Sequence, residues 1–400
     1  MPQVPQSHWK LTVDERQALE AFLRKLVQTP SLPGDEGEVA ALVMDEMRRL
    51  GYDDVQMDAA GNVIGRVGPP EGPGLMFDSH MDTVTVSDRD AWTVDPWGAE
   101  VRDGRLYGLG ACDMKGGLAA TVYGAAALRQ RGPDLKGPIW VACVGLEEPS
   151  EGTCTRILFE EDQMDAQWVV IAEPSSLNVV RAQRGHVEMK LNIQGKSAHS
   201  SAPQLGVNAI YAAARILFGL EMLADQLPND PFLGPGVLAV TDITSHAVSR
   251  NAVPHRCELT LDRRLTLGET ESSVLLEVER VIAREDVDAR VAIIEEEVTT
   301  HTGEVRRARR ASLPWALDER HPLVMAMQAA ARDVGLRPTL TKWPFATEGT
   351  YTACIAQIPT VGFGPGDPTR PHTVDEFIEL RDVHAAASAY AALGTRLLGS

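Results

Sequence analysis

Residues 139–152 read IWVACVGLEEPSEG, an apolar run followed by two adjacent carboxylates. The run 139–144 lies between Gly-Pro and Gly, which predicts a short buried strand. Neighbouring like charges repel, so a Glu-Glu pair at a strand end is a poor structural device. The pair makes chemical sense if Glu148 binds a metal ion and Glu147 is the general base that activates a metal-bound water. The alternative is an acidic loop exposed to solvent.

A second apolar run ends in a His-x-Asp motif. Residues 75–84 read LMFDSHMDTV. His80 and Asp82 lie two apart in an extended segment and therefore share one face of it. His80 is a candidate metal ligand, and Asp82 is a candidate partner that fixes the tautomer of the imidazole. The alternative is a hydrogen-bonded core histidine beside a turn aspartate.

A third apolar run, 168–172, is followed by Glu173. Strands and helices alternate along this half of the chain, which predicts an open α/β sheet. In such sheets, binding sites form where the carboxyl ends of the strands meet. We therefore expect His80, Glu147, Glu148 and Glu173 to lie in one place. The alternative for Glu173 is an acid in a loop before proline.

A glycine-rich segment and a late histidine complete the set of candidates. Residues 108–117 read GLGACDMKGG and precede a helical run of small residues. Asp113 is either the N-cap of that helix or a carboxylate that bridges two metal ions, and both interpretations remain open. The segment lacks the full glycine pattern of a dinucleotide-binding loop. His372 follows proline in a rigid loop near the end of the chain.

The pattern of the chain changes at about residue 184. Strands and helices then follow the order β-α-β-β-α-β, which is that of a ferredoxin-like domain. We predict an inserted α+β domain over residues 184–298 and a catalytic α/β domain made of 1–183 plus 299–400. The basic, polar segment 299–311 is not assigned to either domain with the sequence alone.

Composition excludes several classes of partner. The formal charge of −18 argues against binding to nucleic acid or to an anionic membrane surface. No apolar stretch approaches the roughly 20 residues that span a bilayer, and residues 1–10 lack the features of a secretory signal. The five cysteines are widely spaced without a Cys-x-x-Cys pair, which indicates reduced thiols in a cytoplasmic protein. A metal site would therefore use histidine and carboxylates.

Together these motifs resemble the M20 family of di-zinc metallohydrolases, which includes acetylornithine deacetylases, succinyl-diaminopimelate desuccinylases, aminoacylases and carboxypeptidase G2-like enzymes. The resemblance covers nearly the whole chain, and its motifs occur in the same order: SHMDTV (79–84), GLGACDMKG (108–116), EE (147–148), AEPS (172–175) and PHTVDE (371–376). It implies a mixed-sheet, zinc-dependent exopeptidase-type catalytic domain with an inserted ferredoxin-like domain that serves as lid and dimerisation surface. The protein would then be a homodimer.

The resemblance also implies a set of ligands for two Zn²⁺, for which Co²⁺ or Mn²⁺ are possible substitutes. His80 and Glu173 would bind one ion, Glu148 and His372 the other, and Asp113 would bridge them. Three carboxylates and a bridging hydroxide would balance the charge of the two ions, so the centre could be buried. The family's bridging aspartate is often followed by a cis peptide, which would here be Asp113–Met114.

Further roles follow from the same resemblance. Asp82 would orient His80, and Glu147 would be the base acting with a metal-bridging hydroxide. In the inserted domain, His199 looks like the histidine that reaches the active site of a partner subunit and stabilises the oxyanion. The family's substrate-contacting positions correspond to Asn251 and Arg264, although the neighbouring Arg263 leaves open which arginine faces the substrate.

The expected activity is hydrolysis of an amide bond. A glutamate at position 173 is typical of deacylases and carboxypeptidase-like members of the family. Arg264 and the loop that contains Thr347 and Gly349 could hold a substrate carboxylate. We therefore expect an N-acyl-amino-acid deacylase of the deacetylase or desuccinylase type. The alternative is a dipeptidase or carboxypeptidase acting on a short peptide, and a more remote one is a catalytically inactive binding subunit.

Overall fold

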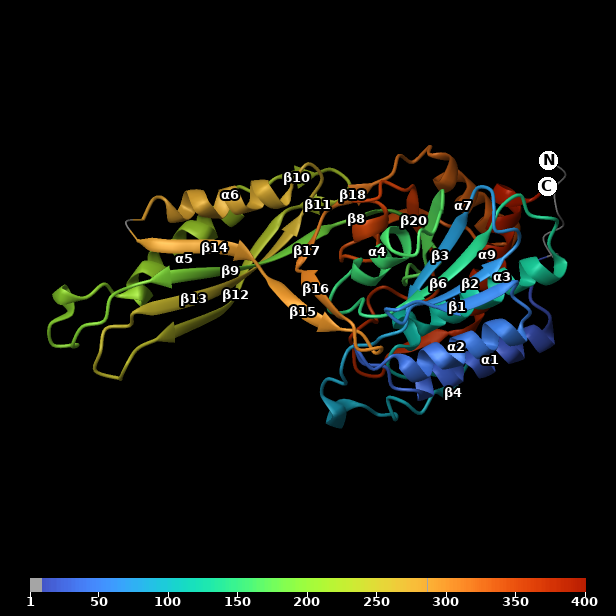
Figure 1. The fold of residues 1–400 in the computed structure, drawn as a ribbon, viewed down its shortest axis with the longest axis horizontal. Helices are drawn as coiled ribbons and strands as arrows, with labels where there is room; N and C mark the ends of the chain where they lie inside the picture. The colour runs from blue at the N-terminus through green and yellow to red at the C-terminus, as the bar shows by residue number, and fades with distance from the viewer. Residues whose placement is uncertain (1–8, 286) are drawn as a thin grey trace.

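The computed structural model describes residues 9–285 and 287–400; most of the segment used to judge a secretory signal, residues 1–8, lies outside this part. Its large sheet runs in the spatial order β1 (Asp54–Met57), β2 (Val63–Val67), β6 (Ile139–Val144), β3 (Leu75–His80), β7 (Trp168–Ile171), β20 (Thr360–Gly362), β8 (Val179–Gln183) and β18 (Trp315–Ala316), with β19 (Leu340–Trp343) also paired to β8. Figure 1 shows this sheet and its helices as the right-hand lobe of the molecule.

The centre of this sheet is parallel. Strand β3 pairs in parallel with β6 on one side and with β7 on the other, and β20 pairs in parallel with β7. The outer pairs β1–β2, β2–β6, β18–β8 and β20–β8 are antiparallel. The carboxyl ends of β3, β6 and β7 therefore lie at one edge of a mixed sheet, which confirms the predicted fold class.

Two apolar layers cover the sheet. Alternate residues of β6 point to opposite faces, so that Val141 belongs to one core and Val144 to the other. The larger core is shared with α1 (Val13–Gln28), α2 (Gly37–Arg49), α3 (Gly116–Arg131), α7 (Pro322–Asp333) and α9 (Leu380–Leu398). The smaller core on the other face packs against α4 (Thr153–Glu160).

Helix α1 shows why the sequence folds in this way. A capping box formed by Thr12 and Glu15 satisfies free N–H groups at its first turn. Its apolar residues recur at helical spacing and are buried, as the sequence predicts: Leu19, Phe22, Leu23, Leu26 and Val27. Helix α3 is buried on every side down to Leu128, because the sheet, α1 and α9 all pack against it.

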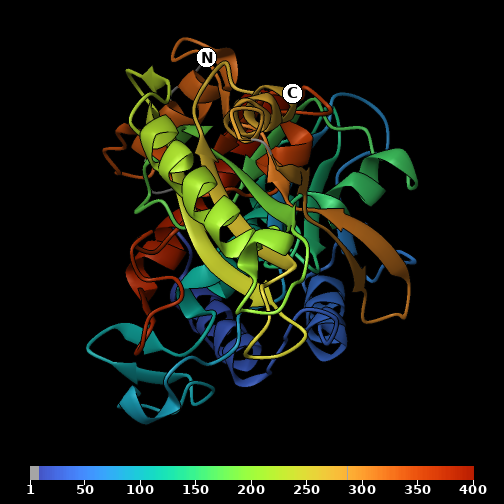
Figure 2. The same ribbon diagram turned by 90° about the vertical axis from the view of Figure 1, so that its left-hand side faces the viewer.

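A second, antiparallel sheet forms the left-hand lobe in Figure 1. Its order is β12 (Val237–His246), β13 (Arg256–Leu265), β9 (Gly185–Gln194) and β14 (Asp288–Ile293), and β17 (Ala311–Ser312) also pairs with β9. Helices α5 (Ala209–Ala224) and α6 (Glu271–Ile282) cover one face and share a separate apolar core with it. Figure 2, viewed from this end, shows α5 in front of the strands. The chain order is the predicted β-α-β-β-α-β.

A hairpin crosses the predicted domain limit at residue 298. It consists of β15 (Glu295–Thr299) and β16 (Val305–Arg309). Its tip contacts the first lobe, where Thr302 Oγ1 donates to Ala59 O at 2.6 Å and Arg306 forms a bidentate ion pair with Glu161. The domain limits at residues 184 and 298 remain a prediction, and the unassigned segment 299–311 is largely part of this hairpin.

Short elements complete the chain. They are β4 (Glu100–Arg102), β5 (Arg105–Tyr107) and β21 (Phe377–Glu379) in one sheet, β10 (Asn229–Asp230) with β11 (Gly234–Pro235), the turns η1 (Arg89–Ala91), η2 (Ala111–Lys115) and η3 (Pro203–Leu205), and the helix α8 (Gly349–Thr352). Within residues 9–285 and 287–400, no helix combines the length and apolar character that crossing a bilayer demands.

Candidate metal centre

The carboxyl edge of the large sheet gathers the predicted side chains. His80 is the last residue of β3, Glu147 and Glu148 follow β6, and Glu173 follows β7. Two groups of possible ligand atoms lie within 4.8 Å of one another: His80 with Glu147 and Glu173, and His80 with Asp113 and Glu148. The predicted convergence of these side chains is therefore seen in the structure.

Asp113 lies between two histidines. Its Oδ1 is 3.2 Å from Nε2 of His80, and its Oδ2 is 3.4 Å from Nε2 of His372. The same nitrogen of His80 is 3.3 Å from Oε1 of Glu173, and that of His372 is 3.2 Å from Oε2 of Glu148. One carboxylate thus faces two sets of ligand atoms, each with one imidazole and one further carboxylate.

The hydrogen bonds of His80 test whether a cation fits. Its Nδ1 is 2.9 Å from the backbone carbonyl of Asp82, and a carbonyl can only accept, so Nδ1 carries the hydrogen. In a neutral imidazole, Nε2 would then point its lone pair at two carboxylate oxygens, those of Asp113 and Glu173. Either a proton on Nε2 or a cation between these acceptors would relieve the arrangement. Imidazole nitrogen with carboxylate oxygen is a donor set that Zn²⁺ takes, so the residues fit the predicted metal.

The charge state of the cluster supports the same conclusion. Burial raises the pKa of Glu147 well above its usual value, and the nearby carboxylates of Glu173 and Glu148 raise it further against the effect of His80. Burial, with the charge of Asp113, raises the pKa of Glu173 to about 8. Hydrogen bonds to Asp113 and Glu148 raise the pKa of His372 to about 10. The acids repel one another and draw positive charge to the histidines, as expected of a site that accepts cations.

The segment around Asp113 is held by a carboxylate from the end of the chain. Asp113 has extended backbone angles, the Asp113–Met114 peptide is cis as the resemblance implied, and α3 begins only at Gly116. The N-cap interpretation of Asp113 is therefore wrong: the cap position is Lys115, whose ammonium donates to backbone carbonyls instead. Glu376 accepts from the backbone N–H groups of Gly110, Cys112 and Asp113 at 2.7–3.2 Å.

Asp82 contacts His80 in a different way from the one predicted. The backbone carbonyl makes the hydrogen bond, whereas the nearest carboxylate oxygen is 3.7 Å from Nδ1. The carboxylate instead accepts from the backbone N–H groups of Glu147 and Glu148 at 3.1 and 3.0 Å. Asp82 thus connects the end of β3 to the segment that follows β6.

A cavity of about 360 Å³ opens beside this cluster. Both lobes line it: Asp113, Glu147, Glu148, Glu151, Glu173, Phe345, Ala346, Pro368, Pro371 and His372 from the first, and His186 and Arg264 from the strands of the second. Arg264 forms a bidentate pair with Asp262 at 2.9 and 3.0 Å. The predicted candidates Thr347 and Gly349 are buried outside the lining, and Thr347 donates to Gln183. Phe345 and Ala346 line the cavity where Thr347 and Gly349 were expected.

The strand register shows which of Arg263 and Arg264 faces the cavity. Arg264 lies opposite His186 on β9, so both point to the cavity side of the sheet. Arg263 points to the other face, is 1% exposed, and pairs with the buried carboxylate of Glu269.

Two predicted residues lie away from this cavity within the chain. His199 is exposed, and its Nδ1 is 2.7 Å from the hydroxyl of Ser201. Asn251 is exposed and accepts from the hydroxyl of Ser249 at 2.7 Å. Neither residue lines the cavity.

Comparisons with known proteins show the family and the fold. Residues 76–396 match the family described as Peptidase family M20/M25/M40. The uncharacterized protein YgeY of Escherichia coli (strain K12) is 34% identical over 382 residues, 95% of this chain and 94% of that protein. Succinyl-diaminopimelate desuccinylase 2 of Ruegeria sp. (strain TM1040) is 28% identical over 389 residues, 94% of each chain. The Bacillus subtilis YXEP protein, a dinuclear metal-binding peptidase, superposes with a TM-score of 0.72 at 17% identity over 97% of this chain and 99% of its own.

Histidines and carboxylates gathered at the carboxyl edge of a mixed α/β sheet form the kind of site that metal-dependent hydrolases use. The match over most of the sequence makes the assignment specific: the chain belongs to the M20 peptidase family.

Proposed function

We propose that this protein is a two-metal amide hydrolase that removes the acyl group from N-acyl amino acids. The observation that carries the proposal is the position of Asp113, whose two carboxylate oxygens face His80 and His372 separately. His80, Asp113 and Glu173 would hold one ion, and Asp113, Glu148 and His372 the other. When bound, such a pair supplies a Lewis acid that polarises an amide carbonyl and lowers the pKa of water toward about 7.

Glu147 is the residue that moves the proton in this proposal. It is buried beside the cluster but belongs to neither of the two sets that share Asp113, and it lines the cavity where an amide would lie. Its carboxylate takes a proton from the attacking water and then gives it to the nitrogen that leaves. The low exposure of Glu147 excludes bulk water that would compete for the proton.

Arg264 supports an amino acid as the leaving part of the substrate. Arg264 lines the same cavity as the cluster, and the pair with Asp262 fixes the orientation of its guanidinium. A guanidinium held in this way suits a carboxylate of the substrate. The similarity to a desuccinylase agrees with an N-acyl amino acid, whereas a dipeptide is the second candidate because it offers the same carboxylate.

The test of substrate class is a comparison of hydrolysis rates. Purified protein loaded with zinc, cobalt or manganese is assayed with N-acetyl and N-succinyl amino acids and with dipeptides that have a free amine. We expect the N-acyl compounds to be cleaved at least about tenfold faster in kcat/KM, because the ammonium of a dipeptide is adjacent to the scissile carbonyl and would lie close to the metal ions that polarise it. Faster cleavage of the dipeptides would mean that the protein is a dipeptidase and not a deacylase.

The two neighbouring arginines give a matched pair of variants. Arg264→Met should raise KM at least about tenfold with little change in stability, because a carboxylate contact is lost. Arg263→Met should leave KM unchanged but lower the free energy of unfolding by about 3 kcal/mol, because Glu269 is left buried without its partner. Kinetics and urea unfolding measure both effects, and the reverse pattern would mean that the substrate contact is misassigned.

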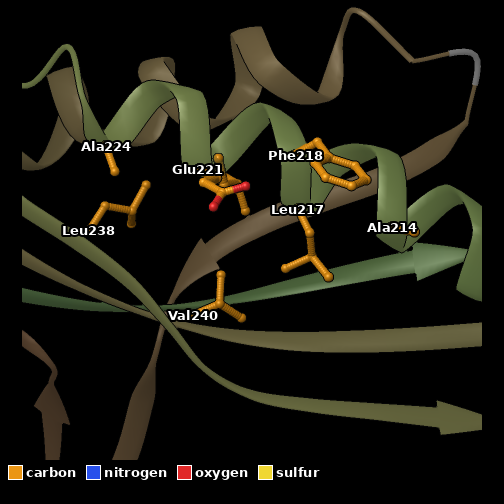
Figure 3. Close-up of a pocket in the computed structure, with 8 residues that line it drawn as sticks. Ala214, Leu217, Phe218, Glu221, Ala224, Leu238 and Val240 are labelled. Carbon is orange, nitrogen blue, oxygen red and sulfur yellow. The ribbon is translucent and has the colours of Figure 1, made fainter.

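An apolar groove on the second lobe supports a homodimer in which the exposed His199 could serve a partner subunit. The apolar side chains Leu217, Phe218, Leu238 and Val240 line a groove between α5 and the edge strand β12, with a volume of about 510 Å³ (Figure 3). Phe218 is 69% exposed, and an exposed apolar face of this kind marks an interaction site. A second copy that covers this groove could bring its His199 to the cavity of the first.

Subunit mixing tests this arrangement. Glu147→Gln and His199→Ala should each be nearly inactive alone. A mixture of the two, dissociated and reassociated, should recover roughly a quarter of wild-type activity, because each hybrid dimer has one intact site. The failure of every mixture to regain activity, with sedimentation showing dimers, would contradict a role for His199 across the interface.

A further inference from the structure

Four consecutive backbone N–H groups after β6 each donate to a buried side-chain oxygen. These donors and acceptors are Gly145 N to Asn62 Oδ1 at 3.3 Å, Leu146 N to Glu36 Oε1 at 3.0 Å, Glu147 N to Asp82 Oδ1 at 3.1 Å, and Glu148 N to Asp82 Oδ2 at 3.0 Å. The acceptors come from three separate parts of the chain: the residue before α2, the residue before β2, and the loop after β3. The segment 145–148 is thus shaped by side chains and not by pairing within the sheet.

The acceptors are themselves fixed. Glu36, Asn62 and Asp82 are each 0% exposed. The amide of Asn62 has one possible orientation, because its Nδ2 donates to Asp58 Oδ2 at 2.7 Å and to the carbonyl of Cys154 at 3.3 Å. Its oxygen is therefore left to accept from Gly145.

The segment adopts a shape that it would not take unaided. Leu146 has φ = 58°, in the left-handed region that non-glycine residues rarely occupy. Gly145 has little room for a side chain, because a Cβ there would lie 3.0 Å from Oε1 of Glu36. Such a backbone persists only where its surroundings impose it.

We propose that Glu36 and Asn62 are positioning residues for Glu147 and Glu148. They accept from the backbone N–H groups of the two residues that precede Glu147, and the carboxylate of Asp82 accepts from those of Glu147 and Glu148. The inference rests on the proposed function, in which Glu147 is the base and Glu148 a ligand. Loss of an acceptor lets Glu147 move relative to the reacting atoms, and a displacement of about 1 Å is enough to cost roughly 100-fold in rate.

The kinetic test compares three variants of the metal-loaded protein. Glu36→Met removes the acceptor at nearly constant size and should lower kcat about 10- to 100-fold with KM within about twofold. Glu36→Gln keeps an oxygen that can accept from Leu146 and should stay within about threefold of wild-type kcat. Val43→Ala is the control, because Val43 is equally buried on the helix α2 that follows Glu36 and belongs to the apolar core. It should lower thermal stability and leave kcat unchanged.

Hydrogen exchange followed by mass spectrometry reports on the segment without any substrate. In Glu36→Met the amides of a peptide covering residues 145–148 should exchange at least about tenfold faster than in wild type, and in Val43→Ala they should not. Asn62→Ala should show the same two effects if Glu36→Met fails to fold. The inference would be overturned if the peptide exchanged at the wild-type rate in these variants, or if their kcat equalled that of Val43→Ala. An inactive wild-type protein would instead overturn the proposed function, and the exchange result would still decide the positioning.

Discussion

Replacement of Glu147 by Gln should lower kcat by about 10³-fold while the protein keeps two metal ions per chain. A glutamine cannot take a proton from water or return it to the leaving nitrogen, and general acid–base catalysis contributes about 10²- to 10⁴-fold. The amide has the same size as the carboxylate, and the backbone N–H of Glu147 still donates to Asp82. We therefore expect little change in KM or in the melting temperature.

The metal content of Glu147→Gln is the control that gives this result its meaning. A carboxylate oxygen of Glu147 lies within 4.8 Å of ligand atoms of His80 and Glu173, so Glu147 is also within reach of one ion. Elemental analysis that shows one ion per chain would make Glu147 a ligand. Unchanged turnover with two ions would place the base elsewhere in the cavity.

Removal of the metal ions should abolish turnover and lower the stability of the first lobe. Without cations the cluster retains four carboxylates, of which Glu147 and Glu173 are buried, and only protons offset their mutual repulsion. An ion present at about 1,000 times its Kd adds about 4 kcal/mol to the free energy of unfolding. Dialysis against a chelator followed by calorimetry measures the loss.

Re-addition of zinc, cobalt or manganese in separate samples serves as the control. Activity should return with two equivalents of metal. Full activity in the chelated protein, shown by elemental analysis to be free of metal, would exclude the proposed centre.

The sheet and most of the candidate centre could be predicted from the sequence because both follow from local patterns. Apolar runs of strand length that end in polar residues identify β3, β6 and β7, and the geometry of parallel strands then brings His80, Glu148 and Glu173 together. The inserted antiparallel sheet was likewise predicted from the order of its elements.

What the sequence could not provide are contacts between distant parts of the chain. Glu376 holds the Asp113 segment from more than 260 residues away, and its only signal was its place in the PHTVDE motif. The face of the sheet to which Arg263 and Arg264 each point depends on the register of β13 against β9, and the local sequence does not specify that register. The N-cap interpretation of Asp113 failed because the backbone there is extended and held by Glu376, so that the helix begins only at Gly116.

Anomalous diffraction from crystals of the zinc-loaded protein, measured at the zinc absorption edge, tests the central claim most directly. We predict two peaks per chain about 3.5–4 Å apart, one beside His80 and Glu173 and the other beside His372 and Glu148, with Asp113 in contact with both at about 2.0–2.2 Å. A single peak, or a pair that Asp113 does not bridge, would contradict the account.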